Sequence, residues 1–112
     1  MTTYMYPKEV DKYIQRYIFM PSRIEVLNVY NNYHKALHGR DNRKMINEIK
    51  SLQAEMQMIK ENIKHKHFKN LDILFRYTGK DAGEKLGIKE KTISVIKNQI
   101  RSQFYDLMTK LS

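Results

Sequence analysis

The residues of this sequence that could do chemistry lie mostly in one polar stretch near residue 90. The candidate set is Lys80, Lys89, Glu90, Lys91, Thr92, Ser94, Val95, Lys97, Asn98 and Arg101. Lysine and arginine neutralise phosphate, asparagine can pair bidentately with adenine, and a valine methyl can touch a thymine methyl. The chemistry on offer is therefore hydrogen bonding and charge neutralisation along duplex DNA.

Position along an expected helix divides this set by role. The residues predicted to lie nearest the groove floor and its flanking phosphates start the helix: Lys89, Lys91 and Thr92. One and two turns later, the exposed face carries Ser94, Val95 and Asn98. Backbone phosphates are the predicted partners of Lys80, Lys97 and Arg101. Lys85 and Lys110 are expected to be solvated and to make no contact with DNA.

The other groups of potentially reactive residues do not indicate an active site. The histidines form two pairs, His34/His38 at i, i+4 and His65/His67 at i, i+2. The first spacing can hold zinc, but Asp41 is the nearest carboxylate and no obvious third and fourth ligands lie nearby. We therefore expect surface histidines and no metal site. Gly79-Lys80 lacks the earlier glycine of a P-loop, and no Gly-x-Ser-x-Gly is present. No catalytic residue, cofactor or enzymatic activity is expected.

Composition supports a nucleic-acid partner. Among 112 residues, 21 Lys+Arg against 12 Asp+Glu give a net charge of +9, which favours nucleic acid before a membrane surface. Only 4 Gly and 2 Pro beside 41% hydrophobic residues favour an all-α fold. The lack of cysteine excludes disulfides, a thiol nucleophile and a cysteine-ligated zinc finger. With no bilayer-spanning run and no leader pattern, we expect a cytoplasmic, nucleoid-associated protein.

The elements that must position the polar stretch follow from two glycines. An apolar helix over Leu71–Tyr77 is followed by a Thr78-Gly79 break and then by a second helical pattern. Gly83 would let two helices approach, and Gly87 would take a turn that strains a side chain. The apolar residues expected between the two helices are Leu86, Ile88, Ile93 and Ile96. This spacing predicts a helix-turn-helix.

The segment from about Leu71 to Leu111 resembles region 4 of bacterial sigma factors and, more loosely, the LuxR-type helix-turn-helix. The resemblance rests on Leu-x-x-x-x-Arg-Tyr, on Gly-Glu-Lys-Leu-Gly-Ile from Gly83, and on Lys91-Thr92-Ile93. The chain also looks like the ArpU/RinA-type late-gene transcription regulators of Gram-positive phages. It departs from sigma factors at Lys89, where they carry a Thr or Ser cap, and at the base-reading positions. The resemblance thus implies that the helix starting near Glu90 enters a major groove of DNA, but it does not imply recognition of the usual −35 promoter element.

Two short helices are expected before residue 42. Pro21-Ser22 is predicted to separate a helix over about Lys8–Phe19 from one over about Arg23–Leu37. The expected inner faces are Val10, Ile14, Tyr17 and Ile18 in the first, and Ile24, Leu27, Tyr30 and Leu37 in the second. Gly39 is expected to end the second helix, before a turn and a new cap near Asn42. The tyrosines of this region are expected to pack rather than to stack on bases.

A heptad pattern predicts a coiled-coil-like helix over about 42–67. Its seam, spaced 4, 3, 4, 3 and 4, consists of Met45, Ile49, Leu52, Met56, Ile59 and Ile63. The next seam position is Lys66, where the pattern stops. Because Ile46 and Met58 broaden the apolar face, the seam could either join two copies as a homodimer or be covered within one chain. We favour the homodimer.

The sequence therefore predicts an all-α protein with a helical oligomerisation region over 1–68 and a helix-turn-helix DNA-binding domain over 69–112. The favoured function is a sequence-specific, double-stranded-DNA-binding transcription regulator of a phage or mobile element in a bacterial host. The sigma resemblance adds a variant that also contacts host RNA polymerase. The alternatives are a small terminase-like packaging subunit and a regulator that binds RNA polymerase or sigma factor.

Overall fold

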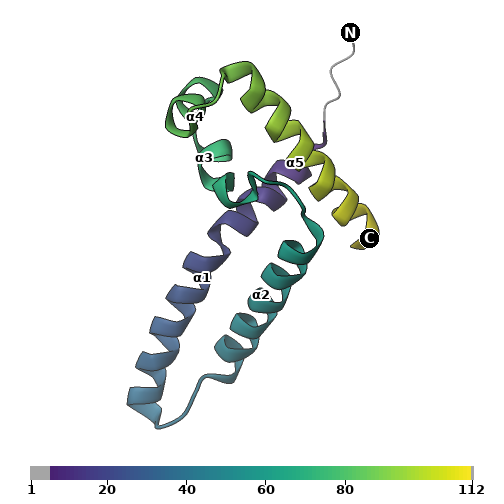
Figure 1. The fold of residues 1–112 in the computed structure, drawn as a ribbon. Coiled ribbons are helices and arrows are strands. Elements are labelled where there is room, and N and C mark those ends of the chain that lie inside the picture. The colour runs from purple at the N-terminus through teal and green to yellow at the C-terminus, as the bar shows by residue number, and fades with distance from the viewer. Residues whose placement is uncertain (1–5, 112) are drawn as a thin grey trace. The chain divides into compact units, whose positions relative to one another are not determined.

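The computed structural model describes residues 6–111, which contain helices and no strand (Figure 1). The elements in order are α1 (Lys8–His38), α2 (Arg43–Asn62), the 3-10 turn η1 (Phe68–Asn70), α3 (Leu71–Arg76), α4 (Gly79–Leu86) and α5 (Glu90–Leu111). The predicted all-α class is confirmed. None of the helices in residues 6–111 combines the length and the apolar character that a bilayer crossing requires.

Helix α1 is continuous through Pro21, so the predicted break between two short helices is wrong. Proline in a helix interior removes one hydrogen bond and crowds the preceding turn, at a cost of about 3 kcal/mol. Met20 and Leu27, on either side of Pro21, are almost fully buried. Each such burial contributes about 1.5–3 kcal/mol, which is enough to offset the proline.

The described residues form two compact units. Phe19–Glu61 is the hairpin unit, and residues 6–18 with 62–111 form what we call the α5 unit. This division differs from the single boundary predicted near residue 68. The first turns of α1 belong to the same unit as helices that begin about 60 residues later in the chain. Periodicity along the chain carries no information on such a long-range association.

In the hairpin unit the second half of α1 lies antiparallel to α2 (Figure 1). The turn matches its prediction: Gly39 has a φ of 71° and donates its N–H to the carbonyl of Lys35 at 2.8 Å. Asn42 caps α2 by accepting from the N–H of Met45 at 3.1 Å. The buried Asn31 donates to Asp41 at 3.0 Å and accepts from the N–H of Asn42 at 2.7 Å, which fixes the turn.

The heptad seam is largely covered within one chain, as the intramolecular alternative expects. Ile49, Leu52 and Ile59 are buried in a single copy, and Met45 and Met56 are half-buried. Their periodicity was genuine, but α1 of the same chain lies along α2. A heptad pattern identifies an apolar face without identifying what covers it.

Helix α2 also ends at Asn62, short of the predicted residue 67. Side-chain hydrogen bonding explains this end, since Gln103 of α5 binds the next peptide groups. The N–H of Lys64 donates to Gln103 Oε1 at 2.6 Å, and Gln103 Nε2 donates to the carbonyl of Lys64 at 2.9 Å. Ile63, the last seam residue, is therefore buried outside the helix.

The core of the α5 unit combines α5 with the first turns of α1. Its fully or nearly buried members include Val10, Ile14, Leu71, Leu74, Ala82, Ile93, Ile96, Ile100, Phe104 and Leu107. The rings of Tyr13 and Tyr17 lie 5.8 and 6.3 Å from that of Phe104, as expected for packing tyrosines. Tyr30 and Tyr33 of the hairpin unit do not follow this expectation, since both are more than half exposed.

Candidate nucleic-acid interface

Helices α4 and α5 are held at close range by Gly83. A Cβ added at Gly83 would lie 2.5 Å from the backbone carbonyl oxygen of Ile88, which no real side chain tolerates. The Gly83 carbonyl also accepts from the N–H of Ile88 at 2.9 Å. Gly87 ends α4 in the left-handed region at a φ of 68°. Both glycines thus occupy positions that a larger residue would strain.

The ends of these two helices are fixed locally. Thr78 caps α4 by accepting from the N–H of Asp81 at 3.2 Å. The carbonyl of Lys89 accepts from the N–H of Ile93 at 3.1 Å as α5 begins. From there α5 buries one stripe, which includes Ile93 and Ile96. The residues between these positions are consequently turned away from the core.

The outer side of the first turns of α5 is open to solvent. The exposed members of the predicted set are Lys80, Lys89, Glu90, Lys91, Thr92, Ser94 and Val95. Val95 is 54% exposed and adds an apolar side chain to this surface. A helix face of lysine, threonine, serine and valine offers donors, acceptors and a methyl surface to a partner.

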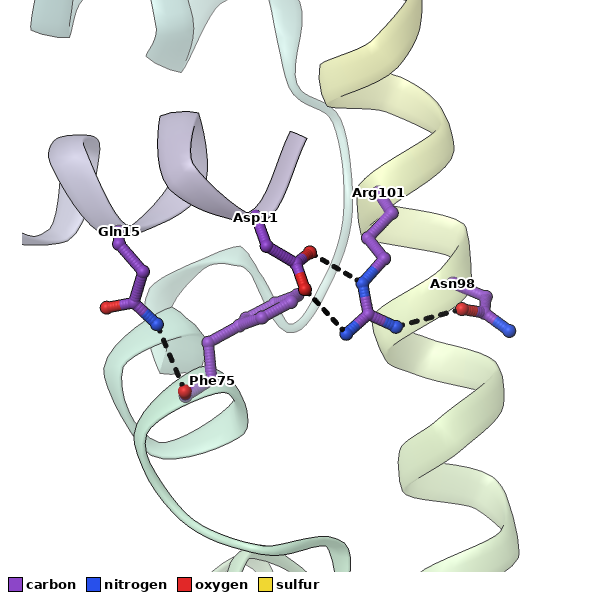
Figure 2. Close-up of polar contacts among 5 residues, drawn as sticks. All are labelled: Asp11, Gln15, Phe75, Asn98 and Arg101. Carbon is purple, nitrogen blue, oxygen red and sulfur yellow. Dashed lines mark hydrogen bonds and ion pairs between the residues drawn. The ribbon is translucent and has the colours of Figure 1, made fainter. Parts of the chain in front are cut away.

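Arg101 differs from its prediction as a phosphate ligand, because an internal ion pair holds it (Figure 2). Its Nε donates to Asp11 Oδ1 at 2.8 Å and its Nη2 to Asp11 Oδ2 at 3.3 Å. Its Nη1 donates to Asn98 Oδ1 at 3.0 Å. Only 22% of the arginine side chain is exposed. Arg101 therefore positions α5 against α1, and one acceptor of Asn98 is already used.

Phe75 of α3 completes this flank of α5. The guanidinium of Arg101 and the ammonium of Lys97 lie 5.3 and 5.1 Å from the centre of its ring. Its carbonyl accepts from Gln15 Nε2 at 3.1 Å, as Figure 2 shows. Burial, and next the charge of Arg101, lower the pKa of Lys97, while Asp11 opposes them. The contacts on this flank hold α1, α3 and α5 together.

The opposite flank of α5 carries functional candidates that the sequence analysis missed. The basic segment Lys64-His65-Lys66-His67, here called the KHKH segment, lies beside α5 across a groove of about 640 Å³. Thr92, Val95 and Gln99 line its helical side. Four consecutive basic residues were a visible signal, but the heptad pattern placed them at the end of a coiled coil.

Hydrogen bonds fix the KHKH segment. His65 Nε2 donates to Gln99 Oε1 at 2.8 Å, and His65 Nδ1 accepts from the N–H of His67 at 3.1 Å. One tautomer of His65, protonated at Nε2, satisfies both bonds. Burial and the positive charges of Lys66, His65 and Lys69 lower the pKa of His67. The groove is therefore lined by two lysines and two histidines on a hydrogen-bonded backbone segment.

The other histidine pair has a local structural role. The rings of His34 and His38 lie 4.5 Å apart, and His34 Nδ1 donates to the carbonyl of Arg40 at 3.0 Å. Over residues 6–111, no three His, Asp or Glu side chains come together as a possible metal site.

Comparison of the chain with protein-family models, with curated proteins and with solved structures finds no match.

Proposed function

We propose that this protein is a sequence-specific, duplex-DNA-binding transcription regulator that inserts the first turns of α5 into the major groove. The observation that carries the proposal is the outward face of α5 beginning at Lys89, which is exposed while the helix itself is anchored by Gly83 and a filled core. The major groove, about 12 Å wide, admits one α-helix. The arrangement of α4, turn and α5 supports a helix-turn-helix.

The residues of this face divide between base edges and phosphates. Lys91, Ser94 and Val95 occupy the exposed outer side, where base edges would be met. The KHKH segment runs beside the same turns and supplies phosphate contacts in place of Arg101. A net charge of +9 adds long-range attraction to DNA. A phage or mobile-element setting rests only on the resemblance given above.

Lys91→Ala is expected to weaken binding to the preferred DNA site about tenfold and to lower the slope of log K against log salt by about one. The lysine lies on the exposed first turn of α5, so its removal takes away one charge contact without disturbing the core. The site is first obtained by selection from random duplexes, and affinities follow from fluorescence anisotropy. Lys110→Ala, also exposed on α5, is the matched control and should bind as wild type does. Equal affinities of all three proteins would contradict the proposal.

Acidification from about pH 7.5 to 6 is expected to strengthen DNA binding about threefold at fixed salt. In the free protein the lowered pKa leaves His67 mostly neutral near pH 7. A phosphate beside it would raise that pKa again, so binding takes up a proton and gains as the pH falls. His67→Gln removes this titration and should flatten the pH dependence. If the DNA affinity of the wild type did not change with pH, the DNA phosphates would not lie beside His67.

A further inference from the structure

Helix α1 carries a second apolar face in the hairpin unit, distinct from the one that is buried. Its members are Phe19, Val26, Val29, Tyr30, Tyr33 and Leu37, with exposed fractions between 41% and 67%. Tyr30 and Leu37 were expected on one inner face with Leu27, but of these three only Leu27 is buried. Large apolar side chains clustered on a surface in this way mark an interaction site. We call this set the α1 seam.

The α1 seam has the spacing of a coiled coil. Phe19, Val26 and Tyr33 are seven residues apart, and Tyr30 and Leu37 continue the alternating steps of three and four. At about 100° per residue, all six members fall within a sector of about 120°. The buried Met20 and Leu27 lie outside that sector, toward the other side of the helix. Helix α1 thus has one face for α2 and another for a second helix.

Charge distinguishes the α1 seam from the rest of this basic protein. Between Phe19 and Leu37 the Lys, Arg, Asp and Glu residues are Arg23, Glu25 and Lys35. Arg23 is ion-paired with Glu48, and the helical rotation places Lys35 about 170° from the centre of the seam. An acidic or nucleic-acid partner would gain little from a surface with so little excess positive charge. Two chains of charge +9 repel each other elsewhere, so this neutral strip is where their approach costs least.

The available area is compatible with a dimer. Phe19, Tyr30 and Tyr33 are 51%, 57% and 67% exposed. At 150–250 Å² for each aromatic side chain, these three offer roughly 350 Å² per copy. The three aliphatic members add to this, toward the ~800 Å² per partner of a stable interface. Tyrosine and phenylalanine are also the residue types enriched at the centres of interfaces.

We propose that the α1 seam is the interface with a second copy of this chain, so that two hairpin units pair through α1 and not through α2. A two-fold axis brings the same patch of each copy together, and a regular heptad strip is complementary to itself. The inference does not rest on DNA binding. If the proposed function also holds, the dimer carries two α5 helices and favours a two-fold symmetric site.

Light scattering of the full chain tests this interface. Wild type at about 50 µM should have twice the 13.5 kDa mass of one chain. Val26→Glu/Tyr30→Glu places two carboxylates in the seam and should weaken the dimer at least ~100-fold, giving the single-chain mass. The matched control Asn28→Glu/Asn32→Glu adds the same charges at the same spacing on the polar side of α1 and should stay dimeric.

Circular dichroism accompanies each mass, so that loss of the dimer is separated from loss of the fold. If the double glutamate variant loses helicity, Tyr33→Ser replaces it, because Tyr33 is 67% exposed and supports no monomer core. A wild type that is monomeric at about 500 µM, or a folded seam variant that keeps twice the chain mass, would overturn the interface. Loss of dimer with full DNA affinity for a half-site would leave the proposed function standing, so the two proposals fail separately.

Discussion

Gly83→Ala is expected to destabilise the α5 unit by about 3 kcal/mol, which lowers the thermal midpoint by more than about 12 °C. The added methyl would meet the backbone carbonyl of Ile88 at 2.5 Å, and a backbone atom cannot rotate away as a side chain can. Helices α4 and α5 must therefore separate, or the turn between them must distort. Urea unfolding followed by circular dichroism measures the loss.

Gly79→Ala is the matched control for this substitution. Its Cβ would approach only the side chain of Glu90, at 3.4 Å, which is ordinary van der Waals contact with a flexible group. Since alanine also favours helix more than glycine does at the start of α4, we expect stability to be unchanged or slightly higher. If both alanine variants unfolded like wild type, the close approach of α4 and α5 would be incorrect.

Phe104→Ala is expected to cost about 3–5 kcal/mol, comparable to the whole stability of a small domain. Phe104 is fully buried, and the rings of Tyr13 and Tyr17 from α1 lie against it. Its removal takes away a packing centre that joins two distant parts of the chain. Tyr105→Ala, at the neighbouring and 36% exposed position, should cost less, about 1–2 kcal/mol, because its ring is only partly buried and contacts that of Tyr6. Equal costs for the two variants would show that α1 does not pack on α5 in this way.

Local features of the fold were predictable from the sequence because they depend on local geometry. Gly83 and Gly87 mark the close approach and the turn between α4 and α5, and both lie where the spacing placed them. The glycine turn at Gly39 and the Asn42 cap were found in the same way. In each case a backbone conformation or a cap limits the residue types that fit.

Features that depend on distant residues were not predictable. Arg101 looked like a phosphate ligand because its partner, Asp11, lies 90 residues earlier in the chain. Pro21 looked like a helix end because the burial that offsets its cost comes from the tertiary fold. The exposed α1 seam was missed for the same reason, since a helix pattern does not show which of two apolar faces its own chain will cover.

The most direct test of the central claim is the perturbation of backbone amide resonances when the isotope-labelled protein is titrated with its selected duplex at about 50 mM salt. We expect the largest changes on residues 89–95 at the start of α5 and on residues 64–67 of the KHKH segment, while α2 is unaffected. Changes confined to α1 or α2, or none at this salt concentration, would contradict the claim that the outer face of α5 binds DNA.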